Sequence, residues 1–399
     1  MEKLRRVVNE IAYTHNPSKL SPLHRSLIPF LSFASSLYKF ALSLRGSLYH
    51  LGFFATHRLR VPVISVGNLT WGGNGKTPMV EFIALWLADS GISPLILSRG
   101  YQGGDEVNML ERHLSGTSAK FGVGANRVAV SGDFIQRYGY VDSRKNSWIE
   151  KPFLDGKVQS HFDSEKIGAV VLDDAMQHWR IWRDLEIVMV NGLTLWGNRQ
   201  LMPLGPLREP LVALRRADII VVHHADLVSE HILNDIESII RGIEESVPIF
   251  FTRMDPSYLF DVGIINSKMP LTALHKAVVL CVSAIGSADS FVQGIQKMET
   301  FFVDRLDFSD HHRFHSRDIE IIRGRLEELA NMFDSKPIVV VTEKDYDRDP
   351  EILKQLSPFK VFVLYSKLRV MSYRGSTEDE FKGLLKEQLG LKLPGANQY

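Results

Sequence analysis

The chain has 399 residues, of which 45% are hydrophobic and 23% are charged, and its formal net charge is +1. This length and usage indicate a globular protein that buries a sizeable core, most simply as two domains. The near-zero net charge gives no argument for a nucleic-acid partner. The single cysteine, Cys281, excludes a disulfide framework.

The N-terminal part of the chain is basic. Between residues 11 and 80 there is no Asp or Glu, whereas Lys and Arg recur through this stretch. The first twenty residues are also basic, but they contain Glu2 and Glu10 and so match a transit peptide poorly.

Residues 26 to 56 are strongly apolar, but Lys39 and Arg45 interrupt them, so no uncharged run reaches the roughly 18 residues of a bilayer-spanning helix. Within them a narrow polar stripe leaves a broad apolar face on one helix. The stripe comprises Ser32, Ser36, Lys39, Ser43 and Ser47, and the face comprises Leu31, Phe33, Leu37, Phe40, Leu44 and Leu48. This pattern fits an amphipathic helix in a membrane interface, with cationic residues near anionic headgroups. It fits equally a helix packed on the protein's own core.

Residues 61 to 78, VPVISVGNLTWGGNGKTP, contain the most informative motif. An apolar run of strand composition leads into a glycine cluster, and apolar residues three and four apart then predict a helix that ends at Gly91. Strand, loop and helix in this order predict the phosphate-binding loop of an ATP site. In such a loop backbone amides converge on phosphate, the lysine reaches the β- and γ-phosphates and the threonine hydroxyl ligates Mg²⁺. The nucleotide-binding residues are therefore Gly72, Gly73, Asn74, Gly75, Lys76, Thr77 and Pro78.

One position departs from the general motif. The pattern G-x-x-x-x-G-K-[ST] places a glycine five residues before Gly75, where this chain has Thr70, and Gly67 lies three residues further upstream. The alternative is a glycine-rich turn that contains Gly-Lys-Thr by chance, and the flanking strand and helix argue against it.

After the loop, continuous apolar runs alternate with helical patterns, at 93–100, 169–174, 185–192 and 217–224. Strands buried on both faces have this composition, which predicts a P-loop NTPase-like α/β fold: a parallel sheet with helices on both faces. Further runs, PIFFTR, AVVLCVSA, PIVVVTEKD and KVFVLYS, predict a smaller C-terminal α/β domain. We predict three parts: an N-terminal extension with the interface helix (1–59), a P-loop core (60–235) and a C-terminal domain that closes over the site (236–399).

A pair of carboxylates ends one of these runs. Ala169 to Leu172 lead into Asp173 and Asp174, which is how nucleotide-binding folds place acidic groups beside the phosphate loop and its metal. Gln177 follows within a turn and offers a neutral oxygen ligand for Mg²⁺. The alternative is that Asp173 or Asp174 caps a following helix.

Other polar clusters have ordinary structural interpretations on the residues alone. GPLREPL at 205–211 is a rigid turn between prolines, most simply solvated surface. Asp105 precedes a helical pattern and suits an N-cap. Asp310-His311-His312 can form a metal or acid/base site, but without spaced partners it favours a polar loop. We assign His223-His224 a structural role.

Taken in order, these clusters resemble the tetraacyldisaccharide 4′-kinase family of the lipid A pathway. The resemblance runs from about residue 22 to about residue 386. It is carried by VGNLTWGGNGKTP, SRGY at 98–101, GDE at 104–106, LDDAMQH at 172–178, RDLEIV at 183–188, GPLREPL, DHHRF at 310–314 and VTEKD at 341–345. The displaced glycine of the phosphate loop matches this family's own version of the motif.

The resemblance implies transfer of the γ-phosphoryl group of ATP to the 4′-hydroxyl of a tetraacylated glucosamine disaccharide 1-phosphate, giving lipid IVA. Its implied roles are phosphate stabilisation by Lys76, a Mg²⁺ shell of Thr77, Gln177 and Glu209, support of metal and nucleophile by Asp173 and Asp174, and a base, Asp105, with His311 as its partner. The implied partners are the acylated disaccharide and a membrane surface. No nucleic acid and no protein partner is implied.

The chain differs from the family pattern at several places. Val107 replaces a proline after GDE, Ala175 replaces a glycine after the aspartate pair, and Asn191 replaces a frequent aspartate. The stretch between SRGY and GDE, where family members commonly carry a β-ribbon, is almost absent. These differences, with the basic extension, favour a mitochondrial member from a eukaryote over one at the cytoplasmic face of a bacterial inner membrane.

Two other function classes compete with a kinase. A dimeric nucleotide switch of the MinD/ArsA type also has a glycine-rich loop beside a strand-end aspartate, but it carries an extra lysine five residues before the loop lysine, where this chain has Trp71. A peripheral membrane module with a decayed nucleotide site is the third interpretation. The intact Lys76, Thr77 and Asp173 argue against decay.

Overall fold

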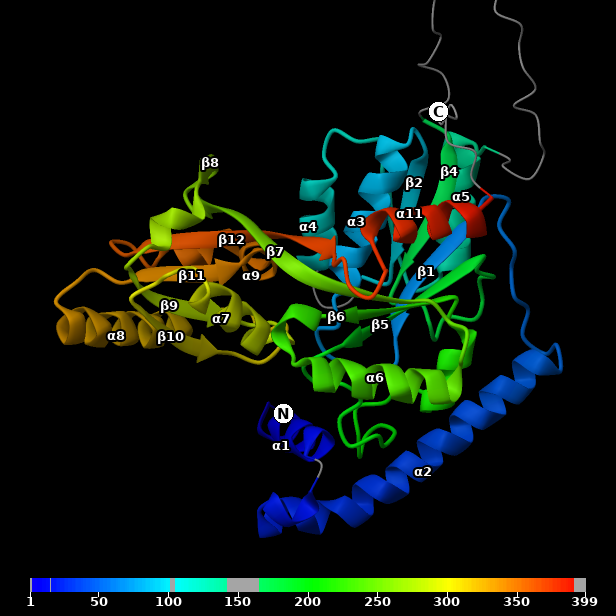
Figure 1. Cartoon of the computed structure of the whole chain (residues 1–399), viewed down its shortest axis with the longest axis horizontal. Helices are drawn as coiled ribbons and strands as arrows, with labels where there is room; N and C mark the ends of the chain where they lie inside the picture. Colours follow the sequence, from blue (N-terminus) through cyan, green and yellow to red (C-terminus); the bar gives the residue numbers. More distant parts are fainter. Residues whose placement is uncertain (1, 15, 101–104, 142–164, 391–399) are drawn as a thin grey trace, which may run out of the picture.

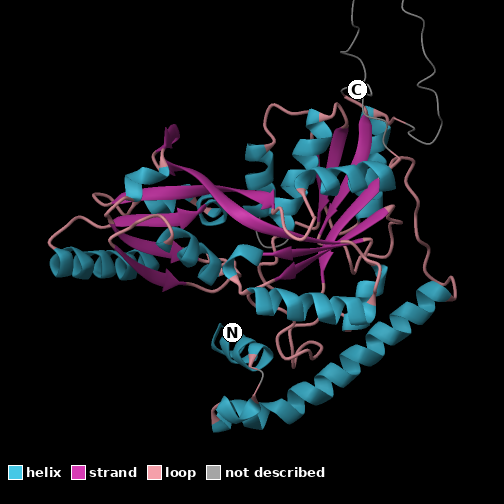
Figure 2. Ribbon diagram, viewed as in Figure 1, coloured by secondary structure: helices cyan, strands magenta, loops and turns pink. Residues whose placement is uncertain are grey.

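The computed structural model describes residues 2–14, 16–100, 105–141 and 165–390. Within them twelve strands form one mostly parallel sheet, drawn in magenta in Figure 2. The strands are β1 (Val63–Asn68), β2 (Ser93–Ser98), β3 (Lys120–Val123), β4 (Ile167–Asp173), β5 (Leu185–Asn191), β6 (Ile219–His223), β7 (Ile249–Asp261), β8 (Ile264–Met269), β9 (Val278–Ser283), β10 (Phe302–Asp307), β11 (Ile338–Thr342) and β12 (Lys360–Val370). Their order is β10-β9-β11-β12-β7-β6-β5-β1-β4-β2-β3, with β8 paired to β7.

Helices cover both faces of this sheet (Figure 1). The α-helices of the described residues, including those away from the sheet, are α1 (Glu2–Tyr13), α2 (Pro22–His50), α3 (Lys76–Asp89), α4 (Asp105–His113), α5 (Arg127–Tyr138), α6 (Glu230–Ile243), α7 (Ala288–Gln296), α8 (Ser316–Phe333), α9 (Glu343–Arg348), α10 (Pro350–Lys354) and α11 (Glu378–Gln388). Around the first strands, α3, α4 and α11 share one apolar cluster, whereas α6 packs in another and α5 in a third. The predicted fold class is confirmed.

Two long antiparallel strands decide where the site lies. Strand β6 ends beside Thr252 of β7, and β11 ends beside Leu364 of β12, which pairs with Leu259 of β7. Because β12 runs antiparallel to β7, the carboxyl ends of β6 and β11 point toward each other across residues 252–259. Ligands of α/β folds bind beyond the carboxyl ends of the strands. Here two such edges face one cavity.

The sheet is continuous through the position where the sequence predicted a domain boundary. Helix α6, which contains residue 235, packs on β6 and the start of β7, and the C-terminal helix α11 packs back onto α3 through Phe381. The division into parts at 60 and 236 stays a prediction.

Helix α2 lies along the outside of the body (Figure 1). Phe33, Leu37, Phe40 and Leu44 are exposed, so the alternative of a helix packed on the core is wrong for this face. Among the described residues, α2 alone is long and apolar enough to span a membrane, judged by length and composition only. That it lies in the interface without crossing stays a prediction.

The inner face of α2 carries polar contacts to the body. The Ser35 hydroxyl donates to Leu201 O at 2.8 Å, and the Tyr38 hydroxyl donates to Arg208 O at 2.8 Å. Arg45 donates to Gln177 O and lies over the ring of Trp179. Arg45 therefore faces the protein, which differs from the expected position near lipid headgroups.

Candidate active site

The phosphate loop turns sharply at Gly75, the residue before α3. Gly75 has φ +78°, and a Cβ there would lie 2.4 Å from the His223 ring, so only glycine fits this position. Helix α3 begins at Lys76, which places Lys76 and Thr77 at a helix N-terminus. Such an end presents unpaired backbone amides and partial positive charge to an anion. The predicted strand, loop and helix are all present.

The side chain of Asn74 holds the loop in its curved form. It is buried and donates to Gly72 O at 2.9 Å and Thr70 O at 3.3 Å, while it accepts from the Thr70 hydroxyl at 3.1 Å. From the end of β5, Asn191 Nδ2 donates to Gly73 O at 2.6 Å. The loop conformation is thus fixed from inside and from the neighbouring strand.

The displaced glycine of the motif has a packing role. A Cβ on Gly67 would lie 2.5 Å from the Cβ of Met176, which belongs to the turn after the aspartate pair. Gly67 therefore lets that turn lie directly against β1. The position of this glycine brings the acidic turn close to the phosphate loop.

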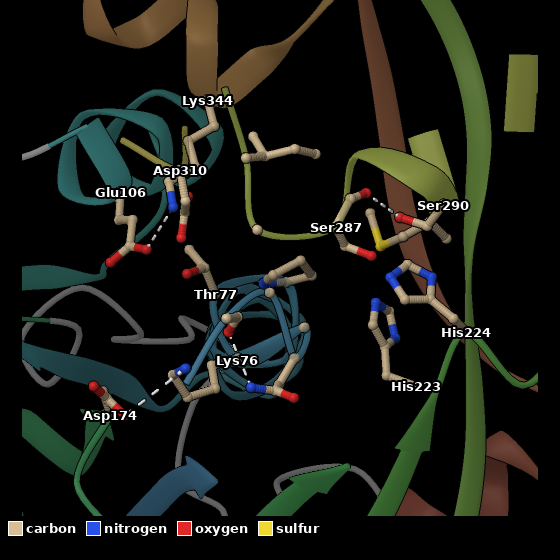
Figure 3. A pocket seen from close by; sticks show the side chains of 18 of the residues that line it. Lys76, Thr77, Glu106, Asp174, His223, His224, Ser287, Ser290, Asp310 and Lys344 are labelled. Atoms are coloured by element: carbon tan, nitrogen blue, oxygen red, sulfur yellow. Dashed lines mark hydrogen bonds and ion pairs between the residues drawn. The ribbon is translucent and has the colours of Figure 1, made fainter. Parts of the chain in front are cut away.

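Asp174 is the anionic centre of a cluster beside the loop. It accepts two hydrogen bonds from Arg208, at 2.7 and 2.8 Å, and its Oδ1 lies 3.8 Å from Lys76 Nζ (Figure 3). Burial acts to raise the pKa of Asp174, but Lys76, Arg208 and Arg127 outweigh it and hold the pKa well below its usual range. Asp174 is ionised at neutral pH.

Asp173 is the second carboxylate and has a different environment. It pairs in register with Val66 of β1, directly before the phosphate loop, and is 2% exposed. Its Oδ1 is buried without a hydrogen-bond partner. Burial, with Glu106 and Asp174 nearby, raises the pKa of Asp173 to about 7. A bare buried carboxylate oxygen is costly, so this atom suits a cation ligand.

Of the other residues predicted to hold Mg²⁺, Thr77 and Gln177 line the cavity with Asp173, whereas Glu209 does not. The side-chain amide nitrogen of Gln177 donates to Asn68 O at 3.0 Å. Glu209 is buried behind the wall, and its Oε1 also lacks a partner while Oε2 accepts from Arg216 at 2.7 Å. The orphaned Asp173 oxygen and the Thr77 hydroxyl in the cavity wall fit a hard divalent cation, whereas Glu209 is not among the residues that line the cavity. Among the described residues no group of three or more His, Cys, Asp or Glu forms a ready-made metal site.

Two residue-level alternatives are wrong. The turn 205–211 is not solvated surface, because Glu209 is buried and Arg208 is bonded to Asp174. No helix begins after the aspartate pair: β4 is followed by turns, and Asp174 has φ +49°, so neither carboxylate is an N-cap.

The C-terminal half contributes the opposite wall of a cavity of about 1230 Å³. Lys344 Nζ, at the start of α9, lies 2.9 Å from Glu106 Oε1 on α4 and 3.5 Å from His311 Nε2 (Figure 3). His311 has φ +63° and lines the cavity beside Asp310. The expectation of a free polar loop, made from these residues alone, is therefore wrong. The structure brings His311 to the site.

Asp105 is only partly placed. The helix predicted after Asp105 is present as α4, which begins at Asp105 itself. The Asp105 side chain and residues 101–104, which contain Tyr101 of SRGY and Gly104 of GDE, lie outside the described part of the chain. The predicted pairing of Asp105 with His311, and the N-cap alternative, stay predictions.

A basic rim borders the cavity on the side of α2. Arg45, Arg127 and Arg180 line it together with His178, whose Nε2 is buried without a partner. Burial and the nearby Arg127 and Arg183 lower the pKa of His178 to about 4. A neutral histidine among arginines can accept or donate toward a polar, anionic ligand.

The other end of the cavity is formed by His223, His224, Ser287 and Ser290, which lie across the loop from Glu106 in Figure 3. His223 Nδ1 lies 3.0 Å from the Thr252 hydroxyl, and burial keeps the pKa of His223 far below its usual range. Burial also lowers the pKa of His224, to about 4, so both histidines are neutral residues of the cavity wall, and the structural role assigned to them stays a prediction.

Comparison with known proteins decides the family. The model of the family described as tetraacyldisaccharide-1-P 4′-kinase matches residues 27–389. The chain belongs to this family. The resemblance stated from the motifs is thereby confirmed.

Curated members of the tetraacyldisaccharide 4′-kinase family are similar over most of their length. An Arabidopsis thaliana protein named "Probable tetraacyldisaccharide 4′-kinase, mitochondrial" is 56% identical over 393 residues, covering 98% of this chain and 99% of that protein. A tetraacyldisaccharide 4′-kinase of Halothermothrix orenii is 30% identical over 79% of this chain and 81% of its own. A crystal structure of LpxK from Aquifex aeolicus in complex with ATP has a TM-score of 0.58 at 24% identity, covering 91% of this chain and 98% of that one.

Some site residues were missed by sequence reasoning. Arg208, Glu106, Lys344 and His178 lie within quoted motifs, but no role was assigned to them. Arg127 had no signal at all, because it is a lone arginine at the start of α5. For the four residues within motifs, the only cue in the sequence was a charged or polar side chain beside a turn or a strand end.

Proposed function

We propose that this protein transfers the γ-phosphoryl group of ATP to the 4′-hydroxyl of a tetraacylated glucosamine disaccharide 1-phosphate, giving lipid IVA. The observation that carries the proposal is the cluster of Lys76, Arg208 and the two aspartates, in a cavity that extends from the phosphate loop to Tyr38 and Arg45 of α2. One cavity thus offers a nucleotide cradle and a route to an apolar helix. Membership of the kinase family supports the same assignment.

Phosphoryl transfer requires positioning and charge more than covalent chemistry. The loop amides at the start of α3 would hold the phosphates, and Lys76, the first residue of that helix, would stabilise negative charge on them. Arg208 fixes Asp174, so that Lys76 is oriented by a preorganised anion 3.8 Å away. Preorganised charges of this kind need no rearrangement during the reaction.

The acceptor hydroxyl must lose its proton as it attacks. We assign this proton to Asp105, with His311 orienting the carboxylate. Support comes from Lys344, whose Nζ lies 2.9 Å from Glu106 Oε1 and 3.5 Å from His311 Nε2 in the wall of the cavity. A positioned carboxylate of this kind contributes general-base catalysis.

The cation set is proposed as Thr77, Gln177 and Glu209, supported by Asp173. The orphaned oxygens of Asp173 and Glu209 are the structural support for this assignment. Mg²⁺ held by these residues would supply positive charge to the transferring phosphate.

The acceptor is a lipid, so the enzyme must reach it at a membrane. Exposed Phe33, Leu37, Phe40 and Leu44 on α2, with Lys39 beside them, suit the interface of an anionic bilayer. We propose a peripheral membrane protein of the mitochondrion. The Arabidopsis thaliana relative is named as a mitochondrial protein, which supports that compartment.

Incubation of the purified protein with γ-labelled ATP and tetraacyldisaccharide 1-phosphate tests the proposal. We expect label in a more polar lipid, loss of transfer when Mg²⁺ is chelated, and no label when lipid IVA replaces the acceptor. Label recovered only as inorganic phosphate would instead indicate a nucleotide-switch ATPase and contradict the proposal.

A further inference from the structure

The end of α1 is anchored in the body of the protein. Ile11 is 2% exposed and Ala12 is fully buried. Asn198, in the loop after β5, donates its backbone N–H to Ala12 O at 2.8 Å and its side-chain amide to Ile11 O at 3.1 Å. The last carbonyls of a helix have no partner within the helix, so these two bonds complete the end of α1.

The loop around Asn198 is shaped to receive this helix end. Gly197 has φ +52°, and a Cβ on it would lie 2.6 Å from Ala12 O. Any side chain at Gly197 would therefore collide with the carbonyl of α1. The same loop reaches the phosphate loop, because Trp71 N donates to Pro206 O at 3.1 Å.

Tyr13 contacts the phosphate loop directly. Its hydroxyl donates to Trp71 O at 3.2 Å and would lie 3.6 Å from a Cβ on Gly72. Asn74 Nδ2 also donates to Trp71 O, at 3.5 Å, so this carbonyl oxygen accepts hydrogen bonds from both Tyr13 and Asn74. Burial raises the pKa of Tyr13 to about 12, and the hydroxyl therefore remains a donor.

We propose that residues 11–13 are a permanent part of the nucleotide site, with Tyr13 a positioning residue for the phosphate loop. The segment lies before residue 27, where the match to the family model begins. If Tyr13 positions the phosphate loop, any processing of the N-terminal extension must end before residue 11. This inference rests on the proposed function only in that the loop binds ATP.

The first test compares Tyr13→Phe with Thr14→Val in the full chain. Thr14 makes a comparable hydrogen bond, from its hydroxyl to Glu10 O at 2.6 Å, but this bond stays within α1. We measure the Kd of a non-hydrolysable ATP analogue by calorimetry, the KM for ATP and for the acceptor, and the melting temperature. Loss of one neutral hydrogen bond predicts about fivefold weaker nucleotide binding and a raised KM for ATP in Tyr13→Phe alone.

The outcomes separate this inference from the kinase assignment. Weaker analogue binding by Tyr13→Phe supports the inference even if the wild-type protein transfers no phosphate to the lipid. An unchanged Kd and KM with a lowered melting temperature would show a merely structural role and overturn it. Wild-type protein that binds no analogue would overturn it together with the ATP site.

The second test is N-terminal sequencing of the mature protein isolated from its cells. We expect a chain that begins at or before residue 10. A mature chain that begins after residue 13 and still binds the ATP analogue would overturn the inference.

Discussion

The ammonium group of Lys344 lies 2.9 Å from Oε1 of Glu106, and this ion pair joins α9 of the C-terminal half to α4 beside the phosphate loop. A buried network of charged side chains from α3, α4 and α9 adjoins this ion pair. His113 lies 2.9 Å from Glu81 and 2.7 Å from Glu343, and Arg112 bonds Asp347 at 2.7 Å. The facing edges of the sheet are thus held together by charge as well as by β7 and β12.

This network predicts a pH-dependent stability. Burial alone would lower the pKa of His113, but hydrogen bonds with Glu343 and Glu81 outweigh it and raise the pKa to about 9. A raised folded-state pKa contributes stability below the unfolded value near 6.5, and this contribution is lost as the pH rises through 9. At 1.36 kcal/mol per pKa unit it is about 3 kcal/mol. The His113 side chain is 4% exposed, so solvent screens it little.

Denaturant unfolding at pH 6 and pH 10 checks this. The free energy of unfolding of His113→Gln should fall well below wild type at pH 6 and approach it at pH 10. His231→Gln is the control, since His231 pairs with Asp235 on the exposed surface of α6. An equal deficit of His113→Gln at both pH values would show that packing, not charge, is lost.

Lys76→Ala should abolish turnover and leave the fold intact, because it removes a charge aimed at the transferring phosphate and little packing. We expect kcat to fall at least about a hundredfold, the scale of one preorganised electrostatic contact. Lys354→Ala, at an exposed lysine paired with Glu351, should retain wild-type rates. Near-normal phosphorylation by Lys76→Ala would contradict the ATP-site assignment.

Asp105 and His311 should behave as one acid/base unit. Asp105→Ala and His311→Ala should each lower kcat far more than they raise the KM for ATP, and the double variant should be hardly worse than the poorer single one. An N-cap role for Asp105 predicts instead about 1 kcal/mol of lost stability with near-normal turnover. Rate constants and melting temperatures of the three variants decide between them, and multiplicative rate losses would reject the pair.

The exposed face of α2 should hold the protein on anionic vesicles. Placing Asp at both Leu37 and Leu44 should weaken flotation with liposomes, and added salt should weaken binding further by screening. The matched control places Asp at Ser36 and Ser43, which are exposed on the polar stripe of α2. Failure of the wild-type protein to float at low salt would remove the interfacial role of α2.

Local patterns were sufficient for much of this site. The phosphate loop needs only a strand, glycines and a helix in sequence, and Asp173 needs only a buried strand that ends in a carboxylate. Both signals lie within about twenty residues, so one sequence predicts them.

The remaining contacts depend on strand direction, which apolar runs do not encode. Lys344 and Glu106 are 238 positions apart and meet because β12 returns antiparallel beside β7. Strand β7 also continues well beyond the predicted run PIFFTR, to Asp261. Its second part contains half-buried polar residues such as Asp255, so it has no continuous apolar run from which a strand could be predicted. Arg208 could not be paired with Asp174 from a turn motif alone.

The position of the transferred phosphate on the lipid is the sharpest test of the proposed reaction. Wild-type protein is incubated with ATP, Mg²⁺ and tetraacyldisaccharide 1-phosphate, and the purified lipid is examined by phosphorus–proton correlation NMR. We expect one new phosphomonoester, on the 4′-oxygen of the distal glucosamine. A phosphate on any other oxygen, or ATP consumed without a phosphorylated lipid, would contradict it.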